Sequence, residues 1–442
     1  MNIHVKESTI IRPAQETPKH SLWISDLDLL VPAIHLPAVG FYRLSNDNSS
    51  NFFDVGLLKE SMSKVLVPFY PMAGRLGRDE NGRIQIQCNG EGVLFQEAEA
   101  NCIIDDFGDF SENLKLLRLV PTVDDTNDIS SYPFLVAQIT RFECGGVSLG
   151  VGFNHIVVDG TSMSQFVHAW AEMTRGVPIT NPPFLDRTVL SVGVPTSPTF
   201  NHIEYNPPPS MIMNTPAQNP ESISTAILEL SIDQINILRE RCKGFHGSNV
   251  KYTRYEILAA HIWRCICRAR GLSNDQINTL YIPTNGRSRL NPPLHPGFFG
   301  NVVFITTSSA LSGDIQSEPL IDTVERIHTT MKRMDDEYLK SALAYLKQLP
   351  DPTILRRGAY TYKCPNLNIS HLIHTGMCNA DFGWGRAMLM RTIAVSDGVI
   401  QIIPNSSNDG SFSVLVNLET RHLQLFKKLF YGIFEHFKNA RL

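Results

Sequence analysis

Residues 176–224 are the stretch that most limits how this chain can fold. Between Gly176 and Pro220 lie ten of the chain's 27 prolines, in runs such as "NPPFLDR" and "YNPPPS". Proline removes a backbone donor and disfavours helix in the residue before it, so no regular strand or helix can run through this stretch. We therefore predict a long crossover at 176–224 that joins an N-terminal lobe, residues 1–175, to a C-terminal lobe, residues 225–442.

Strand and helix patterns are mixed on both sides of the crossover. Before it, "HVKESTIIRP", "GRIQIQC" and "GVLFQEAEA" are typical of strands, and "FDVGLLKESMSKVLVPF" has helical spacing. After it, a strand ending at Leu230 precedes a helix beginning near Ser231, and "RYEILAAHIWRCICRARG" is a helix stopped by Gly271. Further strands are predicted in "TLYIPTNGRSRL", "GNVVFITTSSA" and "SFSVLVNLE", and a closing helix in "LQLFKKLFYGIFEHF". The predicted fold class is α/β, a mixed α+β chain of two comparable lobes.

Composition excludes several functional classes. The chain has 442 residues, 43% hydrophobic and 19% charged, as in soluble globular proteins. A net charge of −4 argues against nucleic-acid binding, and no apolar run reaches the roughly 18–20 residues that membrane insertion needs. Charges at Lys6, Glu7 and Arg12 do not fit a secretory leader. The eight scattered cysteines indicate free thiols in a reducing compartment, so we expect a cytoplasmic protein.

The stretch "FNHIVVDG" places His155 four residues before Asp159. Apolar residues alternate in "GVSLGVGFNH", and His155 continues the same parity, so we expect it at the end of a strand on the core-facing side. The spacing in "TSMSQFVHAWAEMTRG" predicts a helix after it. Thr161 or Ser162 could cap that helix, and Gly176 could end it. The junction between strand and helix would hold the imidazole rigidly while it reaches a cavity.

Several chemistries could use a histidine and an aspartate at this spacing. One H-x-x-x-D is expected by chance, so the pattern alone says little. A zinc site would need further ligands at recognisable spacing, and a serine hydrolase would need G-x-S-x-G; neither is present. Phosphate-loop and dinucleotide fingerprints are also missing. What is left is His155 as a general base, which needs only an imidazole near its ordinary pKa and a bound nucleophile.

A second stretch, "NADFGWGRAMLM", carries Asp381, Gly383, Trp384 and Gly385 and is typical of a tight turn, which Asp381 could tie to a basic partner. Together the two stretches resemble the paired signatures of the plant BAHD acyl-CoA-dependent acyltransferases, H-x-x-x-D-G and D-F-G-W-G in this order. Segments along the whole chain, including "LVPFYPMAGRL", "GRSRLNPPL", "GFFGNVVF" and "NDGSFSVLVNLE", resemble the hydroxycinnamoyltransferase branch near the shikimate/quinate enzymes.

The resemblance implies two chloramphenicol-acetyltransferase-like lobes with a central solvent channel, and His155 as the base at its centre. It implies a hydroxycinnamoyl-CoA donor, a small-molecule acceptor, a monomer, and no metal or other cofactor, because acyl-CoA is a co-substrate. Asp159 would pair with Arg287 or Arg289. Asp381, Gly383, Trp384 and Gly385 would be architectural, and Gly160 would allow a sharp turn. Candidate CoA contacts are Lys251, Thr253, Tyr255, Arg289, Asp409 and Gly410.

Acceptor choice is predicted from differences to the shikimate-type enzymes. Arg357 keeps their arginine for the acceptor carboxylate, and Ser370 keeps a hydroxyl where they have threonine. Leu372 stands where they carry a tryptophan that helps hold the oxyanion, so His371 or His374 would have to replace its donor. His35 is kept. Where the shikimate-type enzymes carry Thr, Ser and Tyr, this chain has Leu36, Ala38 and Gly40.

These replacements remove hydrogen-bonding partners for a polyhydroxylated ring. We therefore expect an acceptor other than shikimate, such as an aromatic hydroxy acid, an amino acid or an amine. The alternatives are an ordinary shikimate/quinate O-hydroxycinnamoyltransferase and a related protein that only binds or regulates.

Overall fold

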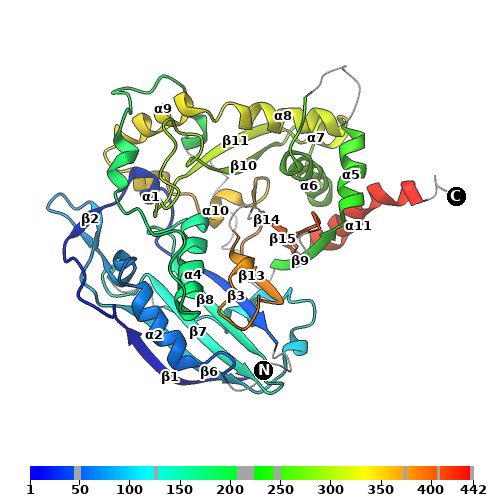
Figure 1. Ribbon diagram of the computed structural model, residues 1–442. Coiled ribbons are helices and arrows are strands. Elements are labelled where there is room, and N and C mark those ends of the chain that lie inside the picture. The colour runs from blue at the N-terminus through cyan, green and yellow to red at the C-terminus, as the bar shows by residue number, and fades with distance from the viewer. Residues whose placement is uncertain are drawn as a thin grey trace.

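The computed structural model describes residues 1–43, 51–123, 128–206, 223–242, 250–371, 376–405 and 409–438. Figure 1 shows two lobes, each built on a six-stranded mixed sheet with helices packed against it. The mixed α/β fold class predicted from the sequence is therefore confirmed, and each predicted strand and helix named above has a counterpart in the structure.

The first sheet has the strand order β1-β6-β7-β8-β3-β13. Its strands are β1 (Ile3–Ile11), β6 (Val93–Ala100), β7 (Leu135–Phe142), β8 (Val147–Asn154), β3 (His35–Tyr42) and β13 (Leu389–Thr392). Helices α2 (Val55–Val65) and α4 (Gly160–Thr174) bury their apolar sides on one face, and α3 (Asn113–Leu117) packs on the other. A small sheet, β2 (Ser21–Trp23), β5 (Ile84–Gln87) and β4 (Arg75–Arg78), adjoins this lobe, as does the short helix α1 (Asp26–Leu29).

The second sheet has the order β11-β10-β12-β14-β15-β9. Its strands are β11 (Val303–Leu311), β10 (Ile277–Asn285), β12 (Leu367–His371), β14 (Val399–Pro404), β15 (Phe412–Glu419) and β9 (Ile223–Leu230). The helices of this half are α5 (Ile232–Arg241), α6 (Arg254–Arg270), α7 (Ser312–Ser317), α8 (Leu320–Lys332), α9 (Asp336–Lys347), α10 (Ala359–Tyr362) and α11 (Thr420–Lys438). Trp263 of α6 and Phe426 and Phe430 of α11 lie in its core, all fully buried.

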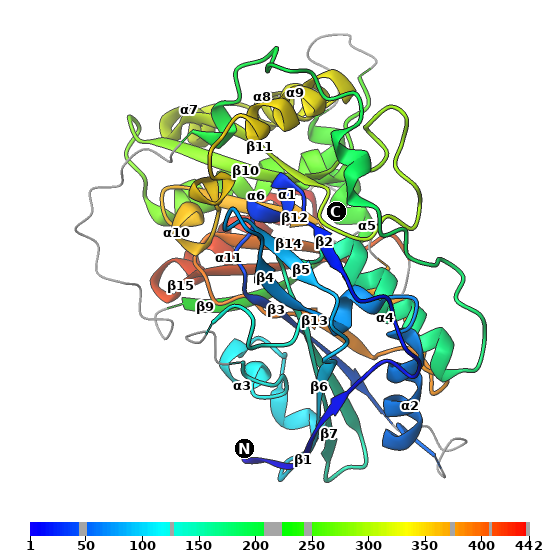
Figure 2. The same cartoon turned by 90° about the vertical axis from the view of Figure 1, so that its left-hand side faces the viewer.

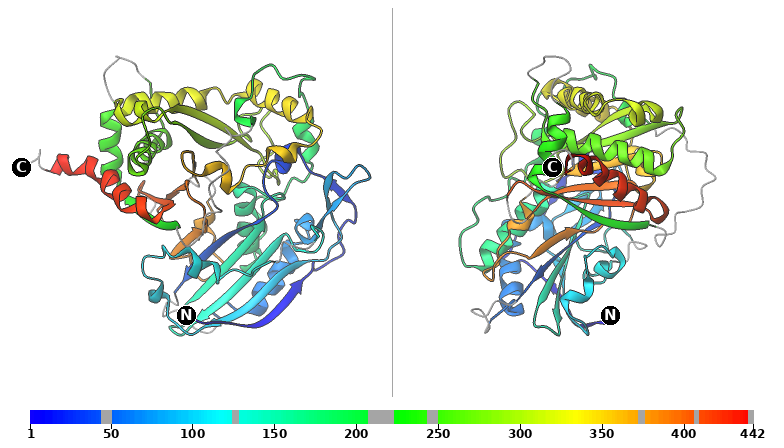
Figure 3. Two further views of the ribbon diagram at one scale, coloured as in Figure 1. Left: turned by 180° about the vertical axis from the view of Figure 1, so that it is seen from behind. Right: turned by 90° about the vertical axis from the view of Figure 1, so that its right-hand side faces the viewer.

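Strand β13 does not follow the division into lobes at residue 225. It pairs antiparallel with β3, with Met390 opposite Gly40, and so completes the first sheet although it comes late in the chain. Figure 3 shows this orange segment reaching from the second lobe into the first. Met377, Phe382 and Ala387, which precede it, also lie in the core of the first lobe. A late segment of the chain therefore belongs to the first lobe.

The crossover packs along the molecule as far as the structure describes it. Figure 2 shows its green trace running down one side, between α4 and the upper lobe. Phe184 bridges to Phe298, and Leu190 and Tyr205 join a core shared with α1 and α9. Short 3-10 helices at Arg187–Ser191 and Ile203–Tyr205 interrupt it, so the stretch carries no long regular element between 176 and 206, as its prolines predict.

All eight cysteines lie within the described residues and none forms a disulfide, which confirms the prediction of free thiols. Five of them are buried. Within the ranges given above, no helix combines the length and apolar character needed to cross a bilayer.

Candidate active site

His155 directly follows β8, at the point where the sheet gives way to α4. Its backbone N–H donates to the Ile34 carbonyl at 2.9 Å, and its ring Nδ1 lies 3.1 Å from the Val158 carbonyl. A carbonyl oxygen can only accept, so Nδ1 carries the proton and Nε2 presents a lone pair. The residue as a whole is only partly buried. This is the tautomer that a general base requires.

The surroundings of His155 favour its neutral form. Burial lowers the pKa of His155 below its ordinary value, and the nearby carboxylates of Asp159 and Asp28 oppose that shift only in part. A base works only while it is deprotonated, and the lowered pKa extends its deprotonated range toward acid. We predict that kcat/KM falls on the acid side with an apparent pKa below about 6.5, the ordinary value for histidine. A pH profile of thiol release measures this limb, and a midpoint above that value would contradict the prediction.

Asp159 is held in a buried ion pair. It is the N-cap of α4 and accepts the Ser162 N–H at 3.0 Å, so the cap is Asp159 and not Thr161 or Ser162. Arg287 grips the carboxylate with two nitrogens, at 2.7 and 3.0 Å, which lowers the pKa of Asp159 despite its burial. Of the two predicted partners it is therefore Arg287 that pairs with Asp159.

The carboxylate of Asp159 binds donors at the contact between the lobes. Besides Arg287 it accepts the Val302 N–H from the second lobe at 3.0 Å. Gly160 begins the helix. It is absent from the glycines with positive φ, so a strained turn is not the reason for this glycine. Asp159 thus supports the loop and does not touch the reacting group.

The "DFGWG" stretch is a turn anchored on the first lobe. Asp381 accepts the N–H groups of Gly383 and Gly385 at 2.8 and 3.0 Å, and both glycines have positive φ, 104° and 93°. Trp384 packs on Phe53 with ring centroids 4.8 Å apart. The predicted turn is present, but Asp381 binds backbone donors of its own turn where the sequence predicted a basic partner. An architectural role follows from these contacts, and a catalytic one does not.

The residues predicted to line the acceptor site include a row on β3, beside His155. His35 pairs in register with Asn154, and its Nε2 donates to the Pro133 carbonyl at 2.7 Å. Leu36, Ala38 and Gly40 follow on one face of β3. This face packs into the core together with α4. A Cβ at Gly40 would lie 2.9 Å from the Met390 Cε, so Met390 fills the room that a larger side chain would need. This face of β3 is apolar, as the sequence predicts.

The other predicted acceptor residues lie on the second lobe. Arg357 is buried, and its guanidinium donates to the backbone carbonyls of Glu204 and Asn206 at 3.1 and 2.8 Å. Ser370 of β12 donates to the Ile400 carbonyl, and the His371 ring lies 5.0 Å from that of Tyr255. Leu372 and His374 lie outside the described residues. The acceptor roles of these residues stay predictions.

The predicted CoA contacts are not equally available to a ligand. Tyr255 is buried and donates to the Ile369 carbonyl at 2.7 Å, so it belongs to the core of the second lobe. Arg289 donates to the carbonyls of Met331 and Met334 at the end of α8, and Thr253 caps α6 in a mutual contact with Glu256. Lys251 is exposed just before that cap. The sequence signal at "KYTRYE" is therefore largely that of a helix start.

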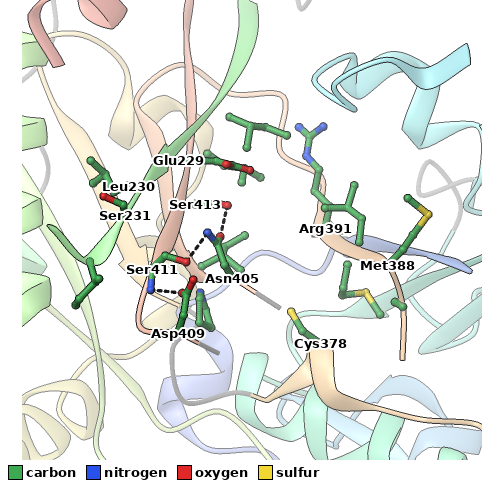
Figure 4. A pocket seen from close by; sticks show the side chains of 18 residues that line it. Glu229, Leu230, Ser231, Cys378, Met388, Arg391, Asn405, Asp409, Ser411 and Ser413 are labelled. Atoms are coloured by element: carbon green, nitrogen blue, oxygen red, sulfur yellow. Dashed lines mark hydrogen bonds between the residues drawn. The ribbon is translucent and has the colours of Figure 1, made fainter. Parts of the chain in front are cut away.

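A cavity of about 550 Å³ opens between the edge strands of the two sheets. It is bounded by β9, by the segment from Cys378 to Arg391 and by the ends of β14 and β15 (Figure 4). Asp409 accepts the Ser411 N–H at 2.8 Å on its wall, and Gly410 beside it has a φ of 86°. Asn405 links Ser411 and Ser413 by side-chain hydrogen bonds. Of the predicted CoA contacts, Asp409 thus lies at a cavity.

Comparison with known proteins identifies the family. The Transferase family matches residues 1–433. The shikimate O-hydroxycinnamoyltransferase of Nicotiana tabacum is 51% identical over 98% of this chain and 100% of its own length. This chain belongs to the BAHD acyl-CoA-dependent acyltransferases. A BAHD relative from Avena sativa, a hydroxycinnamoyl-CoA:5-hydroxyanthranilate N-hydroxycinnamoyltransferase, is 43% identical over 97% of this chain and 99% of its own.

Solved structures agree on the BAHD fold. Vinorine synthase superposes with a TM-score of 0.74 at 21% identity, covering 98% of each chain. The family resemblance drawn from the two motifs is confirmed, and the protein is an acyl-CoA-dependent acyltransferase.

Three residues beside His155 were missed by the sequence analysis. Asp28, Arg187 and Asn301 form a buried polar group that reaches the carbonyls of the histidine loop. The available signal was weak: an aspartate between two leucines in "DLDLL", and polar residues inside the segments "LDRTVL" and "FFGNVV". Buried polar side chains of this kind must find partners, but the sequence does not say which.

Proposed function

We propose that this enzyme transfers a hydroxycinnamoyl group from CoA to the hydroxyl or amine of a small acceptor, with His155 as the general base. The observation that carries the proposal is the hydrogen bond from Nδ1 to the Val158 carbonyl, which leaves the Nε2 lone pair for the acceptor proton. Relatives named for hydroxycinnamoyl transfer, at 51% and 43% identity, support the donor.

In the proposed reaction, Nε2 of His155 takes the proton of the acceptor O–H or N–H as its heteroatom attacks the thioester carbonyl. A tetrahedral oxyanion forms and collapses, which breaks the carbon–sulfur bond. The proton on the imidazole passes to the departing thiolate, so ester or amide and free CoA are the products. The thioester is already activated, and the proposed transfer therefore needs no metal or redox cofactor.

The acceptor we propose is an aromatic hydroxy acid, an amino acid or an amine, in preference to shikimate. Support comes from the face of β3, where Leu36 and Ala38 are apolar and Met390 fills the space beside Gly40. Of Leu36, Ala38 and Gly40 only Leu36 is partly exposed, and a shikimate hydroxyl placed against it would lose its hydrogen bond, at about 1–3 kcal/mol for each unpaired buried group. Relatives of similar overall identity are named for O- and for N-acylation, so both kinds of acceptor are within the family's range.

The second candidate is shikimate or quinate O-acylation, favoured by the 51% identity to the tobacco enzyme and by the retained Arg357. Thiol release from p-coumaroyl-CoA over a panel of shikimate, quinate, aromatic hydroxy acids, amino acids and amines separates the two. We expect an aromatic or amine acceptor to give the highest kcat/KM. Faster turnover with shikimate or quinate than with every other acceptor would reject the preferred candidate in favour of the second.

A protein that only binds or regulates would release no thiol with any acceptor in this panel. The cytoplasmic location and the monomeric state stay predictions from the sequence. Gel filtration and fractionation of the expressing tissue are the direct measurements for them.

A further inference from the structure

We propose that Asp28 is a positioning residue for catalysis, because it holds the loop that carries His155 through Arg187 and Asn301. The inference rests on the proposed role of His155 as the base. Asp28 lies on the short helix α1, outside both signature motifs and far from His155 in the sequence.

The Asp28 carboxylate is fully buried and satisfied on both oxygens. Oδ2 accepts the N–H and the hydroxyl of Ser25, each at 2.7 Å, which closes the start of α1. Oδ1 faces the other way and accepts the backbone and side-chain N–H groups of Asn301, at 2.9 and 2.8 Å. The guanidinium of Arg187 lies 3.1 Å from the same oxygen. One oxygen atom thus accepts two hydrogen bonds from the second lobe and forms an ion pair with the crossover.

Both of these partners continue to the histidine loop. The side-chain amide of Asn301 donates to the carbonyl of His155 at 2.9 Å, and Arg187 donates to the carbonyl of Val157 at 2.8 Å. The next carbonyl, that of Val158, accepts the imidazole N–H. The His155 and Val157 carbonyls are therefore each tied to Asp28 through one intermediate residue, and the Val158 carbonyl that orients the ring directly follows the second of them.

Asp28 and Asp159 bind consecutive backbone N–H groups of the second lobe. Asp28 accepts the N–H of Asn301, and Asp159 accepts that of Val302. Each carboxylate also has its own buried arginine, Arg187 or Arg287. The histidine loop is thus bracketed by two buried ion pairs, of which the H-x-x-x-D motif contains only one. Movement of the second lobe against the first would shift His155 through both.

The charged groups packed around the histidine loop are Asp159 at the start of α4, Asp28 on α1, Arg187 in the crossover and Arg287 after β10. Replacing Asp28 by asparagine removes one negative charge and leaves Arg187 unneutralised. Both changes disfavour protonated histidine, so the pKa of His155 falls further. The acid limb of the pH profile is therefore expected to move toward lower pH.

The experiment compares Asp28→Asn and Asn301→Ala with the wild type and with a matched control. Asp397 is also fully buried, pairs with Arg270 at 2.8 Å and accepts two backbone N–H groups, but its hydrogen-bond partners, Arg270, Cys364 and Glu419, all lie outside the histidine loop. Asp397→Asn therefore removes a buried charge without removing a contact that holds the histidine loop. For each protein, kcat, KM for p-coumaroyl-CoA and for the best acceptor, the pH profile and the melting temperature are measured.

We expect Asp28→Asn and Asn301→Ala to lower kcat by roughly 10- to 100-fold, because a small displacement of the base costs this much, while both KM values stay within about threefold. Asp28→Asn should also move the acid limb to lower pH, and Asn301→Ala, which removes no charge, should leave the limb in place. Asp397→Asn should show a lower melting temperature with an unchanged limb.

Two results would overturn the inference: a kcat for Asp28→Asn that equals that of Asp397→Asn at equal melting temperature, or an acid limb that does not move. A His155→Ala enzyme measured alongside keeps the two proposals apart. If His155→Ala is inactive and Asp28→Asn is normal, the positioning role fails and the proposed function stands. If His155→Ala stays active, the proposed function fails first.

Discussion

Replacing His155 by alanine is expected to lower kcat for thiol release by about 10²–10⁴-fold, the usual contribution of a general base. The variant keeps both lobes and the Asp159–Arg287 pair but loses the Nε2 lone pair that the Val158 contact leaves available. KM for the CoA donor should change little, since the imidazole acts on the acceptor proton. Single-turnover and steady-state rates with the best acceptor give the comparison.

His422 offers a matched control for this substitution. Its Nδ1 lies 3.1 Å from the Ala269 carbonyl, and burial lowers the pKa of His422 as it does that of His155. It stands on α11 of the second lobe, so His422→Ala should keep near-normal kcat. Activity that survives the loss of His155 but not the loss of His422 would remove His155 from the mechanism.

Replacing Asp159 by alanine is expected to lower the free energy of unfolding by about 3–5 kcal/mol, because it leaves the buried Arg287 without its carboxylate. Both partners are buried, and the carboxylate also caps α4 and accepts the Val302 N–H. Activity should fall as well, since the loop between β8 and α4 loses its anchor. Urea unfolding monitored by tryptophan fluorescence measures the stability.

An exposed pair provides the comparison for Asp159. Glu60 and Lys64 on α2 lie 2.6 Å apart but are about half exposed, so Glu60→Ala should change stability little. In the double variant Asp159→Ala/Arg287→Met the unpaired cation is gone, and part of the lost stability should return. A single variant as stable as Glu60→Ala would show that the buried pair contributes nothing net.

Local sequence patterns were sufficient to predict the elements that carry the site. Alternation in β8, helical spacing in α4 and the position of His155 between them all follow from residues close together in the chain. The Asp159–Arg287 pair was predictable only through the family resemblance, and only as a choice between the two arginines of "NGRSR".

Contacts between distant segments could not be read in the same way. Strand β13 has four residues, "LMRT", without clear alternation, so nothing local indicates that it would join the first sheet. The group around Asp28 unites three ordinary polar residues from α1, the crossover and the second lobe, and its existence depends on tertiary packing. Tyr255 and Arg289 show the converse: both have suitable chemistry for CoA, but their polar atoms are already engaged with backbone carbonyls.

The pairing of Gly40 with Met390 has a consequence for how the protein is made. During synthesis, β3 emerges with a row of unsatisfied peptide groups, and β13, the strand that covers them, is made only after all the strands and helices from β4 to α10. Until then the first sheet keeps an open edge, the kind of surface on which nascent chains associate wrongly. The first sheet cannot therefore mature as a self-sufficient unit, and its completion has to wait for the synthesis of β13.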